Sequence, residues 1–124
     1  MNLNQVTLPS KDVAASIAFY ERLGLKTIVS ALPTYARFLC PDGHATLSVS
    51  LVEHEVQHTA TIYFECEDLD NRVKQLQEAG IGFDTQPQDK NWLWREAELR
   101  DPDGNRIKLY YAGENRVNPP WRIN

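Results

Sequence analysis

Hydrophobic and polar positions along the chain follow one pattern that occurs twice. In each copy, a strand-like alternation is followed by a helical stripe of apolar side chains. The two strands are expected at residues 3–8 and 59–65. The two stripes consist of Val13, Ile17, Tyr20 and Leu23 in the first copy and of Leu69, Val73, Leu76 and Ala79 in the second.

Polar residues and glycines set the ends of the two predicted helices. Asp12 and Asp68 precede the helices, where a carboxylate accepts hydrogen bonds from free backbone N–H groups. Gly24 and Gly80 follow them and allow the left-handed turn that ends a helix. Asp-Gly turns join the last two strands of each copy. The strands after the helices are expected at residues 26–29, 36–40 and 45–52 and again at 82–85, 94–99 and 106–111.

Each copy therefore reads as a βαβββ module, and the pattern predicts an α+β fold. Two modules are too few for a solenoid, so we expect two curved mixed sheets around a cleft, with one helix packed on the convex face of each. Within one domain of residues 1–112, module one spans 1–52, the linker 53–58 and module two 59–112. Residues 113–124, with two prolines before Trp121, are expected to form an extended tail on a surface of this chain or of a neighbour.

Charge and composition exclude several classes of partner. The formal net charge is −4, so we expect neither a nucleic acid nor a membrane as a partner, since both favour a basic face. There is no apolar run of about 18 residues and no signal-peptide pattern, which predicts a cytoplasmic protein. Cys40 and Cys66 are expected to be reduced and packed, with a disulfide or a reactive thiol as the alternative.

Several segments resemble the vicinal oxygen chelate superfamily. They include Phe19-Tyr20 and Leu23-Gly24 of the first helix, residues 64–70, and the Asp-Pro-Asp-Gly-Asn turn at residues 101–105. This superfamily includes lactoylglutathione lyase (glyoxalase I), extradiol dioxygenases, fosfomycin-resistance thiol transferases and bleomycin-resistance proteins. The resemblance covers residues 3–111 and implies the paired-module fold. It also implies a homodimer, but it does not choose a function within the superfamily.

The resemblance marks four strand positions at which metal-dependent members hold a divalent ion with His, Gln or Glu. In this chain the four positions are occupied by Gln5, Ser48, Thr61 and Lys108. A Gln oxygen is a weak ligand, hydroxyls are poor ligands, and a lysine ammonium has no lone pair. We therefore expect no metal and no other cofactor. The expectation rests on the strand register, because a one-residue slip would turn every side chain over.

Residues 54–58 read His-Glu-Val-Gln-His, a match to the HExxH zinc motif. The motif binds zinc when its two histidines share one face of a helix. Here it lies in the predicted linker, where no helix of useful length is expected. We interpret it as a polar, solvated segment that could bind zinc or nickel adventitiously. His44, in the first Asp-Gly turn, is expected to be exposed.

Period-two alternation sends one set of side chains to the concave side of each sheet, opposite the apolar positions that face the helices. This polar and aromatic set would suit a small polar ligand. It consists of Gln5, Thr7, Ser48, Thr61, Tyr63, Glu65, Lys108 and Tyr110. Lys108 could hold an anionic group, and Glu65 could act as a base if it were buried. Alternatively, these two residues neutralise each other or reach solvent. No catalytic residue is assigned.

Three tryptophans lie in loop or tail segments. Trp92 and Trp94 follow the polar stretch 86–91, and the resemblance implies that loops of this region border the ligand cleft. Their ring faces would stack there on a flat heteroaromatic molecule. Alternatively, they pack at a dimer interface or cover the core.

Two classes of function remain open. The favoured class is a metal-independent protein that binds, or confers resistance to, a small anionic or aromatic molecule. The alternative is a lyase, isomerase or dioxygenase-like enzyme with a rearranged metal site or an acid–base pair. Lys108 replaces a carboxylate ligand of the relatives. We therefore expect anions to stabilise the protein, divalent metals not to stabilise it, and Lys108→Glu to reverse this preference.

Overall fold

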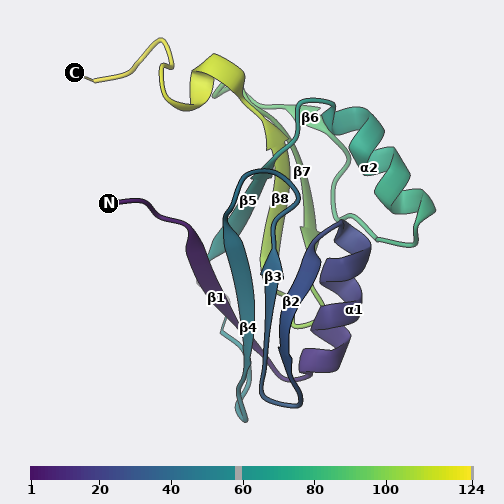
Figure 1. The fold of residues 1–124 in the computed structure, drawn as a ribbon. Coiled ribbons are helices and arrows are strands. Elements are labelled where there is room, and N and C mark those ends of the chain that lie inside the picture. The colour runs from purple at the N-terminus through teal and green to yellow at the C-terminus, as the bar shows by residue number, and fades with distance from the viewer. Residues whose placement is uncertain (58–59, 124) are drawn as a thin grey trace. The chain divides into compact units, whose positions relative to one another are not determined.

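The computed structural model describes residues 1–57 and 60–123 (Figure 1). These residues form two compact units. The first unit contains residues 1–57 together with Asp101–Asn105, and the second contains Ala60–Arg100 together with residues 106–123. Within the described residues, each unit carries one α-helix and one four-stranded mixed sheet. The α+β fold of two similar modules is therefore confirmed.

The first unit has the strand order β1-β4-β3-β2. Strand β1 pairs with β4 in parallel, and the other neighbours are antiparallel. Its elements are β1 (Gln5–Ser10), α1 (Val13–Leu23), β2 (Lys26–Ala31), β3 (Tyr35–Leu39) and β4 (Thr46–Leu51).

The second unit repeats this topology with the order β5-β8-β7-β6, and β5 pairs with β8 in parallel. In residues 1–57 and 60–123, neither α-helix is long and apolar enough to cross a membrane. The elements of the second unit are β5 (Thr61–Glu65), α2 (Leu69–Glu78), β6 (Gln88–Asp89), β7 (Arg95–Arg100), β8 (Arg106–Tyr111) and the 3₁₀ helix η1 (Gly113–Arg116).

Helix α1 begins and ends where its sequence predicts. The Asp12 side chain accepts a hydrogen bond from the backbone N–H of Ala15 (3.1 Å). Gly24 has a φ of 114°, a left-handed conformation that glycine adopts without a steric penalty. The helix packs on β2, β3 and β4 (Figure 1). Its buried side chains are Val13, Ser16, Tyr20 and Leu23.

Helix α2 also lies where its sequence predicts, between Asp68 and Gly80, and packs on β7 and β8. Its first turn differs from the expectation, because the Asp68 side chain makes no capping hydrogen bond to the backbone. The Asp68 carboxylate accepts instead from the side-chain amide of Asn71 (2.9 Å). The buried side chains of the helix are Leu69, Val73 and Leu76.

Three expectations are wrong in detail. Strand β1 continues through Pro9 instead of ending before it, because β1 is an edge strand in which a missing N–H is tolerated. Residues 82–85 form no strand; the N–H groups of Asp84 and Thr85 donate to the Glu98 carbonyl oxygen (2.7 and 3.2 Å). The tail, expected to be extended from residue 113, begins instead with η1.

The turn at residues 101–105 is built around Asp101, which is only 5% exposed. Its carboxylate accepts hydrogen bonds from the backbone N–H groups of Asp103 (2.9 Å) and Asn105 (2.9 Å). It also accepts from the Asn105 side-chain amide (2.8 Å) and from the Tyr20 hydroxyl (2.7 Å). Burial and the charge of Asp101 raise the pKa of Tyr20 far above its ordinary value, so the phenol stays a neutral donor. This turn is part of the first unit, although β7 and β8 on either side of it belong to the second.

Candidate functional site

Lys108 of β8 forms a largely buried ion pair with Glu96 of β7. The Lys108 Nζ lies 3.0 Å from Glu96 Oε1, and only 16% and 5% of the two side chains is exposed. Glu96 Oε2 accepts a hydrogen bond from the indole N–H of Trp92 (2.7 Å). Burial disfavours the charged form of Lys108 and by itself would lower its pKa. The hydrogen bond to Glu96 and the negative charge of Glu96 outweigh burial, so the pKa of Lys108 lies above its ordinary value. The ammonium charge is therefore balanced within the protein, and by Glu96 rather than Glu65.

Tyr63 of β5, Trp94 and Tyr110 of β8 form an aromatic cluster beside this ion pair. Trp94 stacks on Tyr110 with ring centroids 4.7 Å apart, and Tyr63 meets the two rings edge-on at 6.1 and 5.6 Å. The Lys108 ammonium lies 5.5 Å from the centroid of the Tyr63 ring. Tyr110 is 6% exposed, whereas Tyr63 is 46% exposed. The cluster therefore presents a half-exposed ring held in place by its neighbours, on which a flat molecule could stack.

Glu65, at the end of β5, contacts the segment that follows β8. Its Oε2 accepts hydrogen bonds from the backbone N–H groups of Ala112 (2.9 Å) and Gly113 (3.0 Å). Its Oε1 lies 3.7 Å from the Nε of Arg116. Glu65 thus serves as an acceptor for the start of η1, and these contacts engage the oxygens that a general base would use.

Gln5, Thr7 and Ser48 come together in the first unit, on the sheet face opposite α1. Gln5 Nε2 donates to Ser48 Oγ (2.7 Å) and weakly to Thr7 Oγ1 (3.5 Å). The Gln5 side-chain oxygen accepts from the hydroxyl of Thr46. Because Ser48 is fully buried, its hydroxyl is an internal member of this network.

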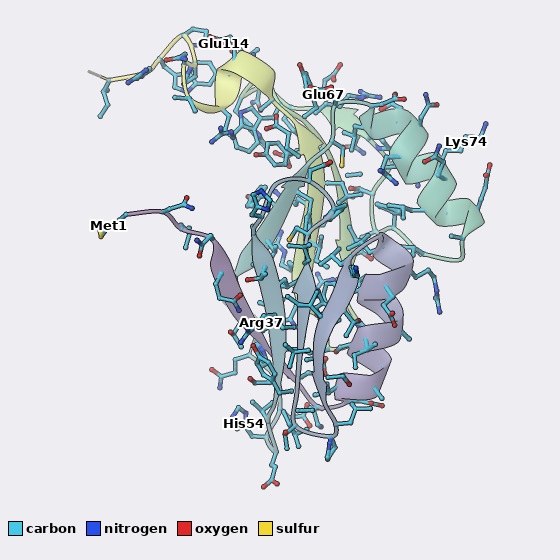
Figure 2. The ribbon with its side chains drawn as sticks, viewed as in Figure 1. Met1, Arg37, His54, Glu67, Lys74 and Glu114 are labelled. Carbon is cyan, nitrogen blue, oxygen red and sulfur yellow. The ribbon has the colours of Figure 1, made fainter. Side chains whose placement is uncertain are left out.

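Tyr35 and Arg37 of β3 extend the same network. Tyr35 Oη lies 2.6 Å from Ser48 Oγ and accepts a hydrogen bond from Arg37 Nε (2.9 Å). The hydrogen bond with Ser48 lowers the pKa of Tyr35, burial opposes this, and Arg37 lowers it further. Arg37 alternates with the buried residues Ala36 and Phe38, so it lies on the sheet face opposite α1 (Figure 2).

Tyr35, Arg37 and Glu96 were not predicted as site residues. The signal that could have found them is the same alternation that selected Ser48 and Lys108, applied to the neighbouring inner strands β3 and β7. The observed register pairs Arg37 with Ser48, and it places Glu96 diagonally across from Lys108.

The four positions at which the resemblance implies metal ligands do not fit a metal. The Lys108 ammonium has no lone pair, and the Thr61 hydroxyl is a poor ligand. The Ser48 hydroxyl is already engaged with Gln5 and Tyr35. Among the residues that the structure describes, no group of three His, Cys, Asp or Glu side chains could hold a metal ion.

The HExxH match does not form the helix that a zinc site of this type requires. Residues 54–57 are not helical, and His54 is exposed; His58 lies outside the described residues. The Glu55 carboxylate pairs with the Lys11 ammonium at 2.8 Å. Glu55 is therefore a surface ion-pair partner. His44 is exposed, as predicted.

Cys40 and Cys66 are both half-buried. Burial raises the pKa of the Cys40 thiol. Because the thiolate is the nucleophilic form, Cys40 is held in its unreactive form at neutral pH. The interpretation of both residues as packed thiols is consistent with this environment.

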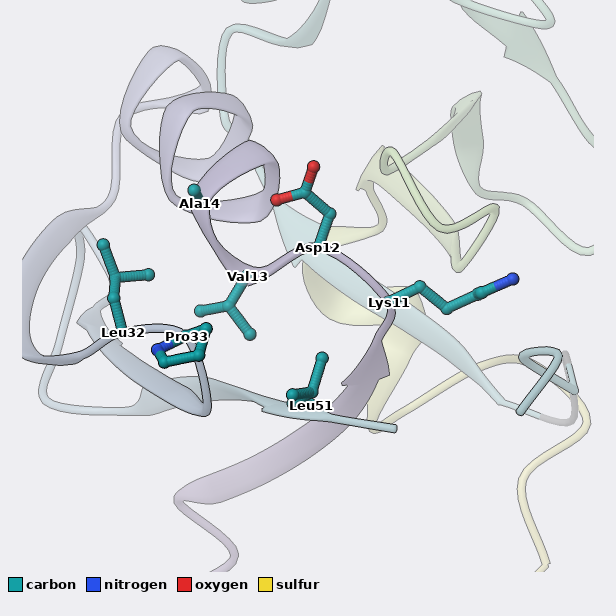
Figure 3. A pocket seen from close by; sticks show the side chains of 7 residues that line it. All are labelled: Lys11, Asp12, Val13, Ala14, Leu32, Pro33 and Leu51. Atoms are coloured by element: carbon teal, nitrogen blue, oxygen red, sulfur yellow. The ribbon is translucent and has the colours of Figure 1, made fainter. Parts of the chain in front are cut away.

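An open hollow of about 320 Å³ lies in the first unit beside the start of α1 (Figure 3). Its polar side chains are already engaged, since Asp12 caps the helix and Lys11 pairs with Glu55. None of the residues predicted to line a ligand cavity lies in it. The residues that line the hollow are Lys11, Asp12, Val13, Ala14, Leu32, Pro33 and Leu51.

Comparison of the sequence with known proteins identifies a matching family and a related protein. The family profile described as Glyoxalase/Bleomycin resistance protein/Dioxygenase superfamily matches residues 2–109. The uncharacterized protein YraH of Bacillus subtilis (strain 168) is 31% identical over 127 residues, which cover 89% of this chain and 98% of YraH.

Two solved structures are similar in fold. A glyoxalase/bleomycin resistance protein/dioxygenase from Nocardioides has a TM-score of 0.80 at 20% identity, covering 100% of this chain and 90% of its own. A bleomycin-binding protein complexed with bleomycin has a TM-score of 0.71 at 22% identity, covering 90% of this chain and 98% of its own. At these identities the likeness concerns the fold alone.

Proposed function

The chain belongs to the Glyoxalase/Bleomycin resistance protein/Dioxygenase superfamily, and on that premise we propose that it binds a small organic molecule without a resident metal ion. The Lys108–Glu96 ion pair is the observation that carries this proposal. At the position of Lys108, the resemblance implies a carboxylate ligand in metal-dependent members. Here an ammonium stands at that position and is held in place by Glu96 at 3.0 Å.

A flat aromatic ligand is favoured over an anion at the face of the second unit. The Lys108 charge is already balanced, so an incoming anion would compete with Glu96 for it. The cluster of Tyr63, Trp94 and Tyr110 offers ring surface instead. The bleomycin-binding protein of similar fold was solved with bleomycin, which makes bleomycin a suitable first probe.

Tyr63→Ala is expected to weaken the binding of bleomycin, or of the simpler probe quinoline, by about 2- to 10-fold, because one aromatic contact contributes about 0.5–1.5 kcal/mol. Titration followed by tryptophan fluorescence measures the dissociation constant. Tyr111→Ala is the matched control. Tyr111 is similarly exposed, at 43% against 46% for Tyr63. It follows Tyr110 on β8, so its side chain lies on the face of the sheet opposite the aromatic cluster. Binding of neither probe to the wild type, or an equal loss in the control, would contradict an aromatic site here.

The wild-type protein is expected to bind no stoichiometric zinc or nickel, whereas Lys108→Glu is expected to bind both weakly. The variant places a second carboxylate close to Glu96, and carboxylate oxygens ligate divalent cations. Calorimetric titration should use proteins in which His54 and His58 are both replaced, because these histidines could bind metal adventitiously. Tight binding at one metal per chain in the protein that retains Lys108 would overturn metal independence.

The alternative function, a lyase or dioxygenase-like enzyme, is tested with untagged wild-type protein. Elemental analysis is combined with turnover assays on the methylglyoxal–thiol adduct and on catechol. Turnover together with stoichiometric metal would favour the enzyme over the binding protein. The homodimer and the cytoplasmic location stay predictions from the sequence.

A further inference from the structure

The two sheets differ in whether their Lys and Arg side chains have carboxylate partners. In the second unit, every Lys or Arg side chain of the strands has a carboxylate partner: Arg95, Arg100, Arg106 and Lys108 are all ion-paired. The strands of the first unit contain Lys26 and Arg37 but no Asp or Glu. Among the described residues, neither of these two cations lies within ion-pair distance of a carboxylate.

Arg37 is the better placed of these two cations to hold a ligand. It is partly buried in the middle of the sheet, whereas Lys26 is exposed at the start of an edge strand. Its Nε donates to Tyr35 Oη, and its guanidinium carbon lies 5.6 Å from the centroid of that ring. This contact orients the guanidinium and leaves its two terminal nitrogens to donate elsewhere. A partly buried charge without a counter-charge is unfavourable, and an anionic ligand would supply one.

The hydroxyls beside Arg37 add a further donor. Tyr35 Oη and Ser48 Oγ lie between two groups that only donate to them, Arg37 Nε and Gln5 Nε2. The two hydroxyls carry two protons, and the bond between them uses one. Whichever residue donates in that bond, one O–H proton remains for another acceptor. The network therefore has one O–H group left to donate, as a site for an oxyanion requires.

We propose that Arg37 and Tyr35 bind an oxyanion, the carboxylate or phosphate group of a small molecule, on the face of the first sheet opposite α1. The guanidinium would bind two oxygens side by side, and a network hydroxyl would donate to the group. The site lies in the first unit and uses none of the residues around Tyr63. Failure of the aromatic site at Tyr63 would therefore leave this proposal unaffected, and the reverse is also true. Anion binding is thereby assigned to Arg37 rather than to Lys108.

The test is a titration of ¹⁵N-labelled protein with inorganic phosphate and, separately, with benzoate, at ionic strength held constant with chloride. The Arg37 Nε–H signal and the amide signals of Tyr35 and Ser48 are expected to shift saturably. Saturation with phosphate alone, with benzoate alone, or with both supports the site and identifies the preferred class of oxyanion. If neither probe produces a saturable shift, the proposal is overturned.

Variants of Arg37 test whether its planar guanidinium group, rather than its charge alone, binds the oxyanion. Arg37→Gln is expected to weaken binding about 10- to 100-fold, and Arg37→Lys, which keeps the charge without the fork, by an intermediate factor. Tyr35→Phe should weaken it less. Arg100→Gln removes the same charge from a cation already paired with Asp84 and should bind as the wild type does. Equal weakening in Arg100→Gln would show that only the net charge matters. Unchanged binding in both Arg37 variants would show that Arg37 does not hold the anion. Either result would refute the site.

Discussion

Asp101→Ala is expected to lower the free energy of unfolding by about 3–5 kcal/mol, because it breaks a buried hydrogen-bond network. Asp101 is 5% exposed, and its carboxylate is the shared acceptor for Tyr20, Asp103 and Asn105. Removing it leaves the Tyr20 hydroxyl and the Asn105 backbone N–H buried without their acceptor. Chemical denaturation followed by circular dichroism measures the loss.

Asp42→Ala is the control for this prediction, since Asp42 also lies in a Pro-Asp-Gly turn but is exposed. It should change stability by less than about 0.5 kcal/mol. Tyr20→Phe removes only one of the donors to Asp101 and should cost an intermediate amount, about 1.5–3 kcal/mol. A loss for Asp101→Ala no greater than for Asp42→Ala would show that the turn does not depend on this carboxylate.

Lys108→Met is expected to destabilise the protein by about 2–4 kcal/mol, because it leaves the Glu96 carboxylate buried without its counter-charge. The loss should be smaller than for a fully buried pair, since 16% of the Lys108 side chain is exposed. Combining Lys108→Met with Glu96→Gln should restore most of the stability. Arg106→Met, on the same strand, is the control: its pair with Glu98 is more exposed, at 41% and 22%, and should contribute less than about 1 kcal/mol.

The contribution of Lys108 should also depend on pH. Its pKa in the folded protein is raised above the ordinary value of 10.5, so folding favours the protonated form. The stabilisation is therefore complete below pH 10.5 and is lost as the pH rises through the folded pKa. The difference in stability between wild type and Lys108→Met should shrink over that alkaline range. A difference that stays constant there would contradict a stabilising ammonium.

The fold was predictable because its signals are local. Asp12 and Gly24 mark the ends of α1 by backbone chemistry that needs no distant partner. The errors arise where tertiary position overrides a local rule. Pro9 is tolerated because β1 lies at the edge of its sheet, and strand order cannot be read from a proline.

The candidate site was predictable only in part. Alternation places Lys108 on the polar face of β8, but its partner depends on which strands flank β8. Because β8 lies between β5 and β7, Glu65 and Glu96 are both within one strand of Lys108. Glu98, directly opposite Lys108 on β7, pairs with Arg106. The backbone N–H groups of Ala112 and Gly113 engage Glu65, which leaves Glu96 as the counter-ion. Those contacts arise from the chain after β8 and give no periodic signal.

The turn at Asp101–Asn105 has a consequence for synthesis of the chain on the ribosome. Residues 1–57 are made first, yet the Tyr20 hydroxyl finds its acceptor only when Asp101 has been translated. The first unit therefore completes its internal bonding after β5, α2, β6 and β7 have already been made. The first repeat is consequently not complete by itself. A graft of it into another protein would have to include the turn at Asp101–Asn105 as well.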